Sequence, residues 1–174
     1  MMDEPNRPAP GTSSSFDRAL LFIGSLAYLG FVPVASGTVA VAVVGVPLHL
    51  LLVGYLELTW PWYAALCAAL TLFAIWVAGH ADRILNEKDS RKSVIDEIPG
   101  YLIALIHLPI TWQIVVAAFF VERTLDIVKV PPANWIERKV PGGWGVVLDD
   151  VVAGLYTLGL LYIGVWMRPS WFGQ

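Results

Sequence analysis

Two pairs of adjacent carboxylic acids, Asp96-Glu97 and Asp149-Asp150, each precede a long apolar stretch. A charge at the centre of a membrane helix costs roughly 2.5–3.5 kcal/mol, and neighbouring carboxylates also repel each other. A divalent cation relieves both problems, and Mg²⁺ prefers carboxylate oxygens as ligands. The pairs therefore predict a Mg²⁺ site at the edge of a membrane. The alternative is that each pair caps the helix that it opens.

A second arrangement of charges surrounds Asp126. Arg123 precedes it by three residues and Lys129 follows it by three, so the three side chains share one face of a helix. Arginine binds phosphate oxygens through two parallel hydrogen bonds, and lysine acts as a point charge. We interpret Asp126 as a metal-binding acid flanked by two phosphate-binding cations. A ladder of salt bridges within one helix is the alternative.

Two segments of small residues are candidates for holding phosphate through backbone amides. Gly142-Gly143 let an anion approach the main chain closely. Ser36-Gly37-Thr38 precede an apolar stretch, as expected of an anion site at a helix N-terminus. An ordinary glycine turn and an ordinary N-cap remain the alternatives for these segments.

The composition shows which kind of fold must position these residues. Of 174 residues, 57% are hydrophobic and only 14% are charged, against about 25% charged in soluble proteins. This excludes a disordered chain, and the net charge of −3 does not favour nucleic acid. The single cysteine, Cys67, excludes an intramolecular disulfide framework. We predict an all-α membrane protein with a disordered tail over residues 1–17 and one helical domain over 18–174.

Residues 39–56, 62–79 and 151–167 are apolar runs close to the length that a membrane span requires. The run at 19–32 is shorter, so it could span, or lie at the interface. Pro109 interrupts residues 100–121, and each half would then be too short to cross alone. We therefore expect a broken or re-entrant helical hairpin around Pro109.

The hairpin also decides on which face the charges lie. Residues 82–97 hold four basic and five acidic residues, and residues 122–139 hold four more basic ones. A hairpin brings both segments to one face, which the positive-inside rule makes cytoplasmic. Asp89, in the first segment, is a further candidate metal ligand.

Four motifs in this order resemble the phosphatidylglycerophosphatase A family: Ser36-Gly37-Thr38; Asp89 with Val94-Ile95-Asp96-Glu97-Ile98-x-Gly100; Arg123-x-x-Asp126-x-x-Lys129-x-Pro131; and Gly142-Gly143-x-Gly145-x-x-x-Asp149-Asp150-x-x-Ala153-Gly154. The resemblance covers about residues 33–160. It implies an all-helical fold and Mg²⁺-dependent removal of the terminal phosphate of phosphatidylglycerophosphate, giving phosphatidylglycerol. It also implies a site on the cytoplasmic side of the inner membrane, a phospholipid substrate and no obligate protein partner.

On that resemblance, seven residues match motif positions of the family. The acidic positions are Asp96, Glu97, Asp126, Asp149 and Asp150, and the basic ones are Arg123 and Lys129.

The sequence departs from the family pattern in three places: the family usually has glycine at Ala40, phenylalanine at Glu122, and Lys-Pro-Trp-Pro where this chain has Lys129-Val130-Pro131-Pro132. These changes leave the motif charges intact and concern the fit of the substrate, so a related lipid phosphate is an alternative substrate. A cation-binding or transport protein is the alternative outside enzymes. Transport would place acids along a midplane pathway and would give Arg123 and Lys129 no role.

Overall fold

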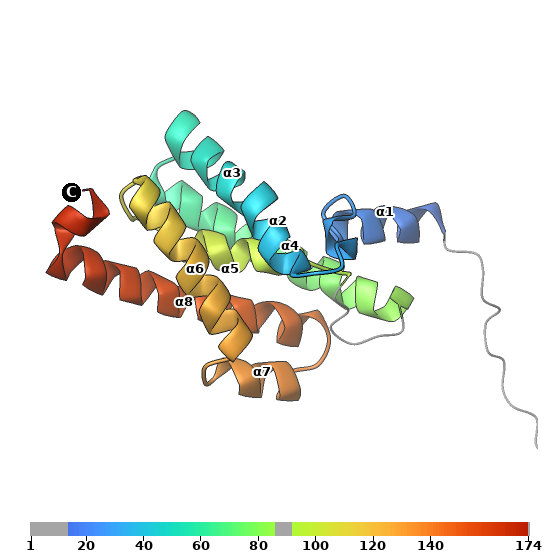
Figure 1. The fold of residues 1–174 in the computed structure, drawn as a ribbon. Coiled ribbons are helices and arrows are strands. Elements are labelled where there is room, and N and C mark those ends of the chain that lie inside the picture. Colours follow the sequence, from blue (N-terminus) through green and yellow to red (C-terminus); the bar gives the residue numbers. More distant parts are fainter. Residues whose placement is uncertain (1–13, 86–91, 174) are drawn as a thin grey trace, which may run out of the picture.

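The computed structural model describes residues 14–85 and 92–173, and all regular structure within them is helical (Figure 1). The helices are α1 (Ser15–Gly24), α2 (Ser36–Ala40), α3 (Val46–His49), α4 (Trp60–Leu85), α5 (Glu97–Ile103), α6 (Trp112–Val128), α7 (Ala133–Lys139) and α8 (Gly143–Met167). Short 3₁₀ turns occupy Leu29–Phe31 and Pro169–Phe172. The expected all-α fold is confirmed.

The N-terminal helix begins earlier than the sequence suggested. Ser14 and Asp17 form a capping box, in which each side chain accepts a hydrogen bond from the other's backbone, and this fixes the start of α1 at Ser15. Residues 14–17 of the expected tail are therefore structured, and residues 1–13 lie outside the described part. With 10 residues, α1 is about 15 Å long, too short to cross a bilayer.

Three helices are long and apolar enough to cross a membrane: Ser36–Tyr55, Trp60–Leu85 and Gly143–Met167. The first joins α2 and α3 through π-helical segments at Val41–Gly45 and Leu50–Tyr55. Pro47 lies between these segments, and its ring and missing N–H disturb regular α-helical hydrogen bonding. The spans predicted at 39–56 and 62–79 therefore coincide with helices of the fold.

The break around Pro109 is confirmed. Helix α5 ends at Ile103, and α6 begins at Trp112, where the Thr111 side chain accepts a hydrogen bond from the Ile114 N–H. The second arm is longer than we expected, because α6 continues for 17 residues to Val128.

The last helix starts at Gly143, eight residues before the apolar run predicted at Val151. Asp149 and Asp150 therefore lie inside α8 instead of opening it. This difference matters for the site described below, since side chains in the interior of a helix cannot cap its free N–H groups.

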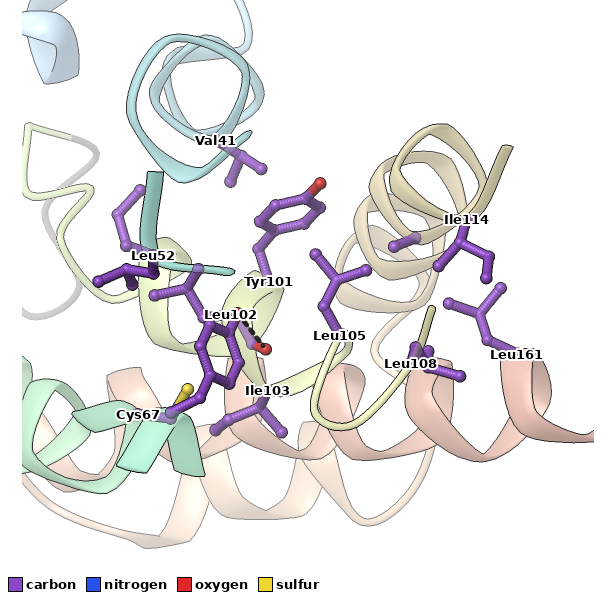
Figure 2. Packing of buried hydrophobic residues seen from close by; sticks show 13 residues of the cluster. Val41, Leu52, Cys67, Tyr101, Leu102, Ile103, Leu105, Leu108, Ile114 and Leu161 are labelled. Atoms are coloured by element: carbon purple, nitrogen blue, oxygen red, sulfur yellow. Dashed lines mark hydrogen bonds between the residues drawn. The ribbon is translucent and has the colours of Figure 1, made fainter. Parts of the chain in front are cut away.

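The core is built around the short helix α5, which contacts α2, α4, α6 and α8. Tyr101 and Leu102 of α5 are fully buried, and Figure 2 shows them meeting Val41, Leu105 and other apolar side chains. Helices α5 and α8 cross closely because each contributes a glycine: a Cβ on Gly154 would collide with the Gly100 carbonyl oxygen. This crossing sets the first turn of α5 against the acidic part of α8.

Candidate active site

All four motif segments contribute to one small cavity of about 170 Å³. Its polar lining comes from the start of α2, the loop before α5 and α5 itself, the end of α6 and the interior of α8. The residues concerned are Ser36, Ser93, Asp96, Glu97, Asp126, Lys129, Asp149 and Asp150. Side chains more than 100 positions apart in the chain thus share one site.

Three of the acids lie close enough to hold one metal ion. Glu97, Asp126 and Asp150 each offer a carboxylate oxygen, and these oxygens lie within 4.8 Å of one another. Each acid comes from a different helix: α5, α6 and α8 respectively. An all-oxygen, all-carboxylate set suits a hard divalent cation such as Mg²⁺ or Ca²⁺. The donor set therefore fits the metal that the sequence predicts.

The two remaining acids flank this trio and are deeply buried. Asp96 is 7% exposed and Asp149 is 2% exposed. Asp96 stands at the N-cap position of α5, but its side chain makes no capping hydrogen bond, and Asp149 lies inside α8. The helix-capping alternative therefore accounts for neither acid pair.

Arg123 links the acids of two helices. Its guanidinium pairs with Glu97 of α5, and it approaches Asp126 of its own helix at 3.5 Å. Two further hydrogen bonds, of 2.6 and 2.7 Å, join it to both carboxylate oxygens of Glu122. Arg123 is only 6% exposed, so its guanidinium faces these acids and little water.

Glu122 is a charged neighbour of Arg123 that the sequence did not predict as part of the site. It is fully buried, and its two oxygens hold the Arg123 guanidinium in a bidentate pair. The sequence analysis noted Glu122 only as a departure from the family pattern. The sequence feature that could have identified Glu122 is a carboxylate inside an apolar run, directly before a motif arginine.

Lys129 is the second cation of the site. It ends α6 in a left-handed conformation (φ 54°), which turns it toward α8, where it pairs with Asp149. It also lies 3.3 Å from Asp126. Partial burial works against the charge, but Asp126 and Asp149 raise the pKa of Lys129 above its ordinary value, so it remains a cation. The predicted salt bridges of Asp126 with Arg123 and Lys129 are therefore present. The two cations also pair with acids of other helices, Arg123 with one of α5 and Lys129 with one of α8.

The Ser36-Gly37-Thr38 segment reaches the site in part. Ser36 lines the cavity. Gly37 packs directly against the Glu97 carboxylate, and a Cβ at this position would collide with it. Thr38 lies in the same turn of α2 but is not among the described residues that line the cavity.

Gly142 and Gly143 lie elsewhere, contrary to the sequence-based expectation. They line a different and larger cavity, of about 800 Å³, together with His80 and Arg83 of α4. Gly143 is required for packing, because a Cβ there would collide with the Ile75 carbonyl oxygen of α4. Asp89 lies outside the described residues, so its predicted role as a metal ligand stays a prediction.

Chemically, the arrangement combines two functions at one membrane-helix boundary. Carboxylates from three helices form a cluster that a divalent cation would neutralise, and Arg123 and Lys129 border the same acids. Carboxylates that hold a metal ion and cations beside them are chemically suited to binding a phosphate group.

Comparison with known proteins decides the family. Residues 22–165 match the phosphatidylglycerophosphatase A family. The chain belongs to this family. The resemblance seen in the sequence is therefore confirmed, and membership makes the chain a phosphatase, which replaces the cation-transport alternative.

Individual relatives are consistent with this family assignment. Phosphatidylglycerophosphatase A of Escherichia coli is 31% identical over 134 residues, covering 76% of each chain. Phosphatidylglycerophosphatase A of Haemophilus influenzae is 27% identical over 162 residues, covering 92% of this chain and 82% of the relative. A Bacteroides thetaiotaomicron protein, provisionally named a phosphatidylinositol-3-phosphatase, is 34% identical over 140 residues, covering 79% of this chain and 86% of the relative. No solved structure matches.

Proposed function

We propose that this protein is a Mg²⁺-dependent lipid phosphatase that hydrolyses phosphatidylglycerophosphate to phosphatidylglycerol and phosphate. The observation that carries the proposal is the convergence of Glu97, Asp126 and Asp150 within 4.8 Å, beside two cations. Family membership supplies the substrate class, and the names of the Escherichia coli and Haemophilus influenzae relatives supply the substrate.

The reaction breaks the bond between phosphorus and the oxygen of the lipid headgroup. Glu97, Asp126 and Asp150 would hold Mg²⁺, with Asp96 and Asp149 beside them and Asp89 as a further candidate. When bound, the ion supplies positive charge against which a phosphate group can enter an acidic cavity. The attacking group is water or one of the aspartates. After hydrolysis the phosphate carries the oxygen of water, and the lipid oxygen leaves with a proton.

The cations carry the electrostatic part of catalysis in this proposal. Arg123 and Lys129 stabilise negative charge on the phosphoryl oxygens, and such preorganised groups lower the barrier most in a site that excludes water. Glu122 holds the guanidinium of Arg123 through two hydrogen bonds, so the arginine is oriented before the substrate arrives. Ser36 and Gly37 shape the side of the cavity next to Glu97.

We further propose that the site faces the cytoplasm from the inner membrane. Arg123, Lys129, Arg138 and Lys139 belong to the end of α6 and to α7, which joins α6 to α8 at the end of the molecule that holds the acidic cavity. A basic excess beside membrane spans marks the cytoplasmic side. The acyl chains would stay in the bilayer while the headgroup reaches the acids.

The test is phosphate release from phosphatidylglycerophosphate by the purified protein in detergent or lipid, with Mg²⁺ and with chelator. We expect release with Mg²⁺ and none after chelation. Glu97→Gln should abolish release, while Glu57→Gln, an exposed acid outside the site, should leave it unchanged. Release that persists in chelator, or in Glu97→Gln at normal folding, contradicts the proposal.

A second substrate is favoured by one observation, the 34% identity to the Bacteroides thetaiotaomicron relative named for a phosphoinositide. The same assay with phosphatidylinositol 3-phosphate separates the two substrates. Faster hydrolysis of the phosphoinositide than of phosphatidylglycerophosphate, again dependent on Mg²⁺, would assign the related lipid phosphate to this chain.

A further inference from the structure

A groove unrelated to the acidic cavity runs between α4 and α8. One part is the cavity of about 800 Å³ that Gly142 and Gly143 line. A second cavity of about 410 Å³ shares Leu72, Ile75 and Trp144 with it. The shared residues make the two cavities one continuous groove along the two membrane-length helices.

The groove changes from polar to apolar along its length. At one end lie His80, Asp82 and Arg83 of α4, next to the first turn of α8. At the other end, deeper along the helices, lie Ala68 and Leu155 with other apolar residues. This gradient matches a phospholipid, whose charged phosphate lies at the interface and whose acyl chain lies in the hydrocarbon.

Two tryptophans mark the boundary between these parts. Trp76 and Trp144 line the polar cavity and are 44% and 51% exposed. Tryptophan is enriched at the level of lipid headgroups because its ring is apolar and its N–H is polar. The level of the two rings therefore places His80 and Arg83 at headgroup depth, where a phosphate can meet them.

The groove and the acidic cavity lie on opposite faces of α8. Val146, Asp149 and Asp150 of this helix line the acidic cavity. Trp144, Leu148 and Leu155 line the groove. At 3.6 residues per turn the two sets are centred about 180° apart. The body of α8 thus separates the apolar part of the groove from the acids.

We infer that this groove is a second phospholipid-binding site, occupied by a bilayer phospholipid that is not the substrate. The Arg83 guanidinium and the first backbone N–H groups of α8 face the phosphate diester, and one acyl chain lies along α4 and α8. The Asp82 carboxylate also borders this end, so the headgroup phosphate binds on the arginine side. The combined volume is of the size of sites that hold large ligands.

The apolar part is tested by a matched pair of substitutions in α4. Ala68 and Ala69 are both exposed, but only Ala68 lines the groove. With phosphatidylglycerol as the probe, titrated into delipidated protein in detergent, we expect Ala68→Trp to weaken binding about tenfold, which corresponds to about two lost methylene contacts. Ala69→Trp should bind as the unchanged protein does. Equal effects of the two substitutions would overturn the proposal.

The polar part is tested in the same way. Arg83→Gln should weaken phosphatidylglycerol binding about fivefold, because an exposed charged hydrogen bond is lost. Arg138→Gln removes an exposed cation from α7, outside the groove, and should have no effect. Diacylglycerol, which lacks phosphate, should bind the protein weakly and with no dependence on Arg83. Tight diacylglycerol binding, or equal loss in both arginine variants, would show only nonspecific annular lipid.

A variant of the acidic cavity keeps this proposal separate from the proposed function. Asp149→Asn should retain phosphatidylglycerol binding in the groove, whether or not it hydrolyses any lipid phosphate. Loss of groove binding in Asp149→Asn at normal folding would mean that the bound lipid occupies the acidic cavity, and the second site would be wrong.

Discussion

The two faces of α8 differ in polarity and in how closely other helices pack against them. One face places Asp149 and Asp150 in a cavity of about 170 Å³ and surrounds them with charges from other helices. The other face presents Trp144 and Leu148 to a wider groove. Buried charges need partners at fixed positions, so the acidic face is packed by three elements, whereas an apolar face can stay open to lipid. One helix can therefore serve chemistry on one side and the membrane on the other.

The largest effect should come from the acidic face itself. Asp150→Asn keeps the shape of the side chain but removes the charge that completes the trio with Glu97 and Asp126. We expect the rate of Mg²⁺-dependent phosphate release to fall on the order of 10³-fold, as for loss of a main electrostatic group. Membrane insertion and thermal unfolding, measured in parallel, should show a folded protein. An active, folded variant would remove Asp150 from the site.

The next largest effect should come from removing the buried acid that pairs with Arg123. Glu122→Gln takes the buried negative charge from Arg123 and leaves one hydrogen-bond acceptor. Removing one partner of a buried pair costs about 3 kcal/mol or more. We expect a lower unfolding midpoint and about tenfold slower phosphate release, since Arg123 is no longer held in one orientation.

Thr124→Ala is the matched control, because Thr124 is exposed on the same helix. It should change neither activity nor unfolding by a comparable amount. If Glu122→Gln behaved like this control, the bidentate pair would have no positioning role.

A smaller loss of stability is expected when a glycine at the contact between α8 and α4 is replaced. Gly143→Ala forces a Cβ toward the Ile75 carbonyl and to 2.7 Å from the Gly79 nitrogen. Overpacking of this kind costs about 1–3 kcal/mol, measured as a lower unfolding temperature. Gly159→Ala, in the same helix but with no atom within 4 Å of the added Cβ, should be neutral or stabilising. The reverse order would mean that α4 and α8 do not approach closely here.

The smallest effect is expected on the groove face away from the helix contact. Leu148→Ala removes an apolar lining residue, on the side of α8 opposite the acids. Phosphate release should stay within about twofold of the unchanged protein, since no group of the acidic cavity moves. A loss close to that of Asp150→Asn would show that the two faces are coupled through α8.

Local properties of the sequence predicted several parts of the molecule correctly. The apolar runs at 39–56 and 62–79 lie in helices long and apolar enough to cross a membrane, because length and hydropathy are properties of the local sequence and need no tertiary contacts. The break near Pro109 follows equally from the missing N–H of proline. The motif spacing indicated the family, which the comparison confirms.

The start of α8 and the place of its glycines could not be predicted locally. Gly142-Gly143-Trp144-Gly145 has low helix propensity and was interpreted as a phosphate-binding turn. The fold makes it the first turn of α8, because Gly143 lies against Ile75 of α4 and Gly145 lies against the Val140 carbonyl. Close approach of other backbone atoms, which helix propensity does not include, explains Gly143 and Gly145, whereas Gly142 precedes the helix with a positive φ of 63°.

The sequence by itself therefore determined the helical class, the break around Pro109, the family, and which acids are candidates for chemistry. Only the tertiary structure decided that Glu97, Asp126 and Asp150 converge, that Glu122 holds Arg123, and that the glycine segment belongs to another cavity. The physical reason is the distance along the chain over which each effect acts. Hydropathy and proline chemistry act within a few residues, whereas a site shared by four helices exists only once their packing has brought distant side chains together.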